Sequence, residues 1–131
     1  MSIWTKVNAS VRLGTHVGLD QTYELSTAVH DFNNEVPTGS EGPLTVSYVH
    51  TYLSDNQSFT TFSISGSLRD YYRDNVDEEL IPWLNEIIKG KNITSGIAEI
   101  EVCCQDCVEY ILQIQCVDKD FEWVTIQVDE A

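Results

Sequence analysis

The chain has 131 residues, 42% of them apolar, which is enough to form one domain (residues 1–131) with a hydrophobic core. Seven Lys or Arg against 21 Asp or Glu give a net charge of −14, which disfavours direct binding to nucleic-acid phosphates or anionic lipids. The sequence shows neither an apolar run of the roughly 20 residues that a membrane helix needs nor the pattern of a signal peptide, so we expect a cytoplasmic protein.

The first half of the chain predicts a strand, a helix and a hairpin. Apolar residues alternate with polar ones from Ile3 to Leu13, as in a strand with one buried face. A helix is expected over about 22–33, where apolar residues recur at helical spacing. After a loop, two strands follow with their turn at 54–58. Gly66 falls on the inward face of the second strand, where the missing side chain leaves room for a helix or a ligand.

The second half predicts one more helix and three strands. The helix shows an apolar stripe and ends at Gly90, and Asp77, Glu78 and Glu79 lie near its start, where the helix dipole favours anions. Pro82 implies that this helix either begins only one turn earlier or kinks there. Alternating segments around 98–102, 110–116 and 124–128 complete the order β-α-β-β-α-β-β-β.

This order predicts an α+β fold with two helices packed on one face of a mostly antiparallel sheet, a ferredoxin-like core with extra C-terminal strands. The other face of the sheet is then open. Trp4 and Trp123 are expected there and would be exposed, unless a loop or the chain's own ends cover them. The open face is therefore a candidate surface for a partner or for a homo-oligomer.

The acids are concentrated in the last part of the chain. Residues 92–131 contain nine acids and one Lys, a net charge of −8. These acids either form a solvated surface or provide an anionic face for a basic partner. Glu99, Glu101 and Glu109 are the candidate partner-binding residues, because each is expected on the polar face of the sheet or near its edge.

The cysteines and histidines do not form a recognisable catalytic or metal motif. Cys104 and Cys107 make a single CxxC, flanked by Cys103 and Cys116, whereas a structural zinc site usually needs two such pairs. The CxxC lies between two strands and not at a helix N-terminus, so small, partly buried thiols in a turn are expected. We predict no metal, no cofactor and no catalytic residues, although a site assembled only by the fold would escape this reading.

A second candidate site lies where the hairpin meets the second helix. Arg69 either pairs with Asp70 or Asp74 and ties the loop to the helix, or it helps to hold a planar or anionic small ligand. The residues expected to line such a ligand site are Ser40, Glu41, Arg69, Tyr71 and Tyr72.

Three segments carry a resemblance to a known group of proteins. Ile3-Trp4-Thr5-Lys6-Val7, the loop from Pro37 to Gly42, and the segment from Ser63 to Tyr71 together resemble small, uncharacterised phage and prophage accessory proteins, over roughly residues 1–72. The resemblance implies an early phage protein that binds and inhibits host machinery, including anti-defence factors and mimics of the DNA backbone.

Charge and resemblance together predict a binding protein rather than an enzyme. The leading hypothesis is an acidic phage-type inhibitor or anti-defence protein, possibly acting as a DNA mimic, that engages a basic host protein in the host cytoplasm. The alternative is a protein that sequesters a small ligand such as a nucleotide signal, through the region of Arg69 and Tyr71.

Overall fold

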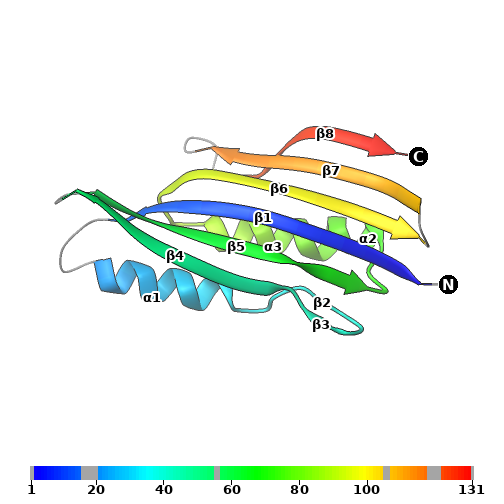
Figure 1. The fold of residues 1–131 in the computed structure, drawn as a ribbon, viewed down its shortest axis with the longest axis horizontal. Helices are drawn as coiled ribbons and strands as arrows, with labels where there is room; N and C mark the ends of the chain where they lie inside the picture. Colours follow the sequence, from blue (N-terminus) through cyan, green and yellow to red (C-terminus); the bar gives the residue numbers. More distant parts are fainter. Residues whose placement is uncertain (1, 16–20, 55–56, 105–106, 118–121, 131) are drawn as a thin grey trace.

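The computed structural model describes residues 2–15, 21–54, 57–104, 107–117 and 122–130. Their main feature is a six-stranded antiparallel sheet with the strand order β4-β5-β1-β6-β7-β8 (Figure 1). The sheet strands are β1 (Ile3–Thr15), β4 (Thr45–Ser54), β5 (Gln57–Arg69), β6 (Ile93–Cys104), β7 (Cys107–Val117) and β8 (Val124–Glu130). A small two-stranded sheet is formed by β2 (Thr38–Gly39) and β3 (Gly42–Pro43). The expected α+β class with an antiparallel sheet is confirmed.

The central strand β1 orients the whole core. It pairs with β5 on one side and with β6 on the other, so it has no free edge along this length. Val7, Ala9 and Val11 are buried, whereas the side chains between them are exposed. This alternation is the period-two pattern predicted from the sequence. The buried side chains face the helices, and the other face of the sheet stays open.

Helix α1 (Gln21–Phe32) connects β1 to the β2–β4 region and packs on the sheet through its C-terminal turns. Ala28 and Phe32 are buried, and the ring of Phe32 stacks on that of Phe62 in β5 with 4.0 Å between the ring centroids. This contact joins the first helix to the hairpin that follows it in the chain. Phe32, the last apolar residue of the predicted helical spacing, is the residue that makes this contact.

The second helical segment is continuous but changes its geometry near Pro82. It consists of α2 (Arg73–Asn75), a π-helical turn η1 (Val76–Leu80) and α3 (Ile81–Ile88). The backbone N–H of Ile81 donates to the carbonyl of Val76, five residues back. A proline ring would clash with the carbonyl four residues earlier in a regular α-helix, and the wider π turn relieves this crowding. Helical structure begins at Arg73, so the expected start only one turn before Pro82 is wrong, and the chain instead departs from regular α-helix just before the proline.

Strand β8 departs most clearly from the sequence pattern. All seven of its residues are exposed, including Val124, Ile126 and Val128 at 41–49%. The pairing with β7 shifts register between Gln113 and Ile114, and β8 forms an edge of the sheet. An edge strand gains contacts from one neighbour only, so its alternating pattern did not lead to a buried face.

The space that Gly66 was expected to leave is filled. Gly66 has a φ of +150°, a region that is strained for other residues, and a Cβ at this position would lie 3.2 Å from Cδ2 of Leu44. Leu44 is itself buried. The inward face of β5 therefore offers no room there for a ligand.

Replacing Gly66 with alanine should lower the free energy of unfolding by about 1–3 kcal/mol, because the backbone conformation favours glycine. Urea denaturation followed by circular dichroism measures this value. Ser65→Ala is the matched control, since Ser65 is exposed on the same strand, and it should change stability by less than about 0.5 kcal/mol. Equal effects of the two substitutions would contradict this account of Gly66.

Candidate functional site

The loop between β2 and β3 lies against the end of β5. The backbone N–H of Ser40 donates to the carbonyl of Arg69 at 2.9 Å. A Cβ on Gly39 would lie only 2.7 Å from the backbone nitrogen and oxygen of Arg69, so the close approach requires glycine. The sequence prediction that this loop and Arg69 belong to one site is therefore right about their proximity.

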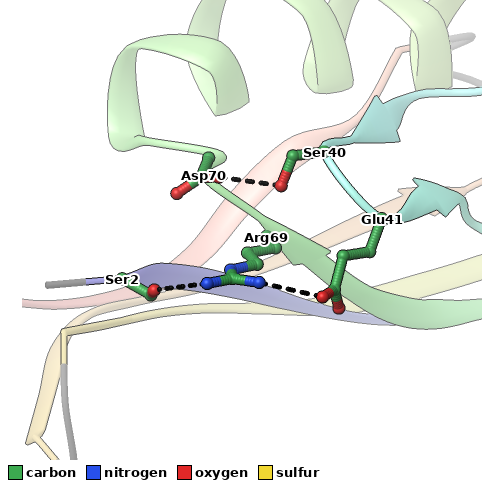
Figure 2. Close-up of polar contacts among 5 residues, drawn as sticks. All are labelled: Ser2, Ser40, Glu41, Arg69 and Asp70. Atoms are coloured by element: carbon green, nitrogen blue, oxygen red, sulfur yellow. Dashed lines mark hydrogen bonds and ion pairs between the residues drawn. The ribbon is translucent and has the colours of Figure 1, made fainter.

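Arg69 is held by several groups at this point (Figure 2). Its Nη1 donates to Oε1 of Glu41 at 2.9 Å, and its Nη2 donates to Oγ of Ser2 at 3.2 Å. Its guanidinium carbon lies 5.8 Å from the ring centre of Trp4. In the same cluster the Oγ of Ser40 donates to Oδ2 of Asp70 at 2.8 Å. The arginine thus joins the chain's beginning to the β2–β3 loop.

These contacts correct the expected partner of Arg69. Among the described residues Arg69 pairs with Glu41, whereas the sequence predicted Asp70 or Asp74. Asp70 instead has a φ of +58° and donates its backbone N–H to the carbonyl of Ile3, which extends the pairing of β1 with β5. The predicted role of the arginine in tying down a loop is kept, but its partner lies in the β2–β3 loop.

Tyr71 belongs to the core and does not line a ligand site. Its side chain is 2% exposed, its hydroxyl donates to the carbonyl of Asn75, and its own carbonyl accepts a 2.6 Å hydrogen bond from Thr5. Burial, together with the nearby carboxylate of Glu79, raises the pKa of Tyr71 well above its ordinary value. Tyr72 is 49% exposed. The predicted ligand site therefore lacks the aromatic ring of Tyr71.

Trp123 is also buried, contrary to the expectation that it lies on the open sheet face. Its indole Nε1 donates to the carbonyl of Leu84 at 2.9 Å, and its backbone N–H donates to Oδ1 of Asn85 at 3.0 Å. The ring packs on Gly96, where an added Cβ would lie 3.0 Å from it. Because Gly96 in β6 has no side chain, the indole fits between this strand and α3. Trp4 is half-buried, beside Arg69.

The open face of the sheet carries charges of both signs. Lys6 stands opposite Glu101 in the pairing of β1 with β6, and Glu99 accepts a 2.9 Å hydrogen bond from Gln113. Arg12 lies 3.9 Å from the ring centre of Phe59 on the same face. Two of the three carboxylates predicted to bind a partner thus lie close to cations or amides, which weakens their field.

The third predicted carboxylate, Glu109, is exposed near the tip of the β6–β7 hairpin. The register passes from Val102 opposite Tyr110 to Cys103 opposite Val108, so Glu109 is the extra residue of a bulge. A bulge points a side chain away from the regular alternation. Glu109 therefore lies outside the regular alternation of β7, and both Glu109 and Glu101 lie close to Cys103.

A denser group of acids lies on the second helical segment. Asp74, Asp77, Glu78 and Glu79 are all exposed on α2 and η1, and we call these four residues together with Glu130 of β8 the acidic corner. Arg73 joins the two parts, since it pairs with Glu130 and lies 4.2 Å from the ring centre of Tyr110. Among the described residues, no ion pair involves Asp74, Asp77 or Glu78.

The sequence contained a signal for the acidic corner. Four acids lie in the six residues from Asp74 to Glu79, but from the sequence Asp77, Glu78 and Glu79 are interpreted only as charges at the start of a helix, and Asp74 only as a partner in an ion pair. The contribution of Glu130 could not be read from the sequence, because it depends on the contact of Arg73 with the last strand.

A cleft of about 190 Å³ lies between the C-terminal part of α1 and α3. Four of its five lining charges are paired, Lys91 with Asp31 at 2.7 Å and Lys89 with Glu86 at 2.9 Å, and Glu35 is the fifth. Trp83 also lines the cleft and donates its indole N–H to the carbonyl of Asn34. The cleft contains none of the residues expected at the two sites predicted from the sequence.

Within the described residues, no group of three or more His, Cys, Asp or Glu side chains is placed to hold a metal ion. No helix in this part of the chain is both long and apolar enough to cross a bilayer.

The fold and these surfaces define an acidic α+β domain with helices on one face of an antiparallel sheet. Comparisons with protein-family models, with curated proteins and with solved structures found no match.

A double-mutant cycle on Arg69 and Glu41 should detect a coupling of about 0.2–1 kcal/mol in the free energy of unfolding, the range for an ion pair that is partly exposed. The variants are Arg69→Ala, Glu41→Gln and the double substitution, measured by urea denaturation. Arg69→Lys keeps the charge but loses the two-armed guanidinium group, so its free energy of unfolding should lie between those of Arg69→Ala and the wild type. A coupling of zero would mean that the cluster does not stabilise the fold.

The stability of the protein should fall as the pH rises above about 10. The folded state holds the proton of Tyr71 more tightly than the unfolded state, whose pKa is near the ordinary value of 10.0. The contribution of the protonated Tyr71 to the free energy of unfolding is complete below that pH and is lost as the pH rises toward the folded pKa. Tyr71→Phe should therefore show a shallower alkaline decline in denaturation experiments. Tyr72→Phe, at an exposed position, is the control and should decline as the wild type does.

Proposed function

We propose that this protein works by binding a basic protein partner through the acidic corner. The observation that carries the proposal is the exposure of Asp74, Asp77 and Glu78 on one helical segment, with no ion pair to any described residue. Exposed carboxylates that form no ion pair attract cationic side chains, and Arg73, which interacts electrostatically with Asp77, offsets only part of their charge. The open sheet face offers less, because its acids lie beside Lys6 and amide groups.

The net charge of the chain supports the same proposal. At −14 the whole molecule attracts basic surfaces, and the acidic corner gives that attraction a direction. Steering of this kind raises the association rate, and it fades as salt screens charges beyond about 8 Å at physiological ionic strength. The partner should therefore present Lys and Arg side chains.

The resemblance to phage accessory proteins gives the proposal a context. In that context the partner is a host protein in the cytoplasm, and the protein is an inhibitor or anti-defence factor. A helical run of carboxylates is also one way in which a protein can imitate the phosphates of a DNA backbone. If the protein acts as such a mimic, it will compete with duplex DNA for its partner.

The alternative of a small-ligand site at Arg69 receives less support. Tyr71 is buried, and two nitrogens of the arginine already bind Glu41 and Ser2. The Nε of Arg69 is buried and has no hydrogen-bond partner among the described residues, so the guanidinium group retains a donor that the contacts with Glu41 and Ser2 do not use.

Two sets of reversals with the same change in net charge test the proposal. The first variant carries Asp74→Lys, Asp77→Lys and Glu78→Lys, and the second carries Lys at the three strand positions proposed from the sequence: Glu99, Glu101 and Glu109. Wild-type protein immobilised on beads would first capture partners from host lysate at low salt. The association rate of each captured partner, once purified, is then measured by surface plasmon resonance with the wild type and both variants.

The first variant should reduce the association rate by at least tenfold at low salt, with a smaller effect as salt rises, and the second should reduce it far less. Circular dichroism and thermal melting confirm that both variants are folded. An equal loss in both variants would mean that only net charge matters. A loss confined to the second variant would place the interface on the open sheet face and refute the acidic corner.

A further inference from the structure

Cys104 and Cys107 stand directly opposite each other at the end of the β6–β7 hairpin. This end of the sheet lies near the N-terminus of β1, where β6 finishes and β7 begins (Figure 1). Opposed residues in an antiparallel pair have Cα atoms about 4.5 or about 5.5 Å apart, depending on their hydrogen bonding. Both values fall inside the range of about 4.4–6.8 Å that a disulfide spans. The two thiols can therefore be joined without moving the strands.

The other two cysteines are less suited to such a bond. Cys103 is buried, and burial together with Glu101 and Glu109 raises the pKa of its thiol, which lowers its reactivity. Cys116 is buried in the core opposite Gly96, toward the other end of β7. Cys107 is exposed and Cys104 is half-buried, so an oxidant in solution reaches this pair first.

We propose that Cys104 and Cys107 form a redox-sensitive dithiol that a low-molecular-weight disulfide, such as oxidised glutathione, converts to an intramolecular disulfide. The thiolate of Cys107 attacks one sulfur of the oxidant, and a mixed disulfide forms as the first small thiol leaves. The thiolate of Cys104 then attacks the sulfur of Cys107 and releases the second small thiol. The two protein thiols lose two electrons and two protons, and the oxidant becomes two thiols.

The position of the pair makes the change local and reversible. Only two residues separate the cysteines in the sequence, so the closed ring is small and constrains the unfolded chain little. The bond would fix the hairpin next to the bulge at Glu109, and the following residue, Tyr110, stands opposite Glu130 of the acidic corner. This modification site goes beyond the proposed function and does not depend on it.

The experiment uses the full-length protein in buffers with increasing ratios of oxidised to reduced glutathione. Remaining thiols are trapped with an alkylating reagent, and intact mass is measured without and with prior reduction. The wild type should lose two of its four thiols and the mass of two hydrogen atoms, with no glutathione retained. A proteolytic fragment spanning residues 102–109 should contain the bond. Excess dithiothreitol should restore all four thiols.

Single serine substitutions identify the pair. Cys103→Ser should still form the internal bond. Cys104→Ser should instead retain one glutathione on Cys107, and Cys107→Ser should form no internal bond. Circular dichroism checks the folding of each variant, including Cys103→Ser at its buried position, and serine at positions 104 and 107 should change the spectrum little. The proposal is overturned if the wild type keeps four thiols across the whole range. It is equally overturned if Cys103→Ser abolishes the bond, or if Cys104→Ser still forms one.

Discussion

The one-sided burial of β1 is the constraint on which the rest of the structure depends. Because β1 pairs on both sides, its alternate side chains must face either the helices or the open face, with no third possibility. Two helical connections then return the chain to the same side of the sheet, and the core forms between them. The stacking of Phe32 on Phe62 and the burial of Leu84 and Ile88 complete that layer.

This burial removes groups that seemed available for function. The indole of Trp123 fills the space above Gly96 and satisfies its N–H on the carbonyl of Leu84. The phenol of Tyr71 is enclosed beside the helical segment that follows it. Aromatic rings contribute most to stability when they are buried and their polar atom is hydrogen-bonded, so these two rings stabilise the fold.

The surfaces that remain differ in character. The open sheet face mixes Lys6 and Arg12 with a few carboxylates, whereas the acidic corner carries carboxylates with Arg73 bound to one of them. The hairpin end adds a third feature, two accessible thiols opposite each other. The thiols and the acidic corner are neighbours, since Glu130 stands opposite Tyr110, which follows Cys107 by three residues, and each can be altered without disturbing the core.

The sequence by itself determined the strands of the main sheet, the two helical segments and the faces of the inner strands, because a buried face leaves a period of two in β1, β6 and β7 and a helical period in α1 and α3. It predicted only a loop where the short strands β2 and β3 lie. It could not determine the register of β8, which depends on a bulge in the pairing with β7. It could not determine the place of Trp123 either, because the indole packs on Gly96 in a distant strand. It also named Arg69 and the β2–β3 loop as one site, yet the partner Glu41 emerged only when the loop folded back onto β5. Long-range contacts decided these features, because sequence periodicity records which face is buried and carries no information about what covers it.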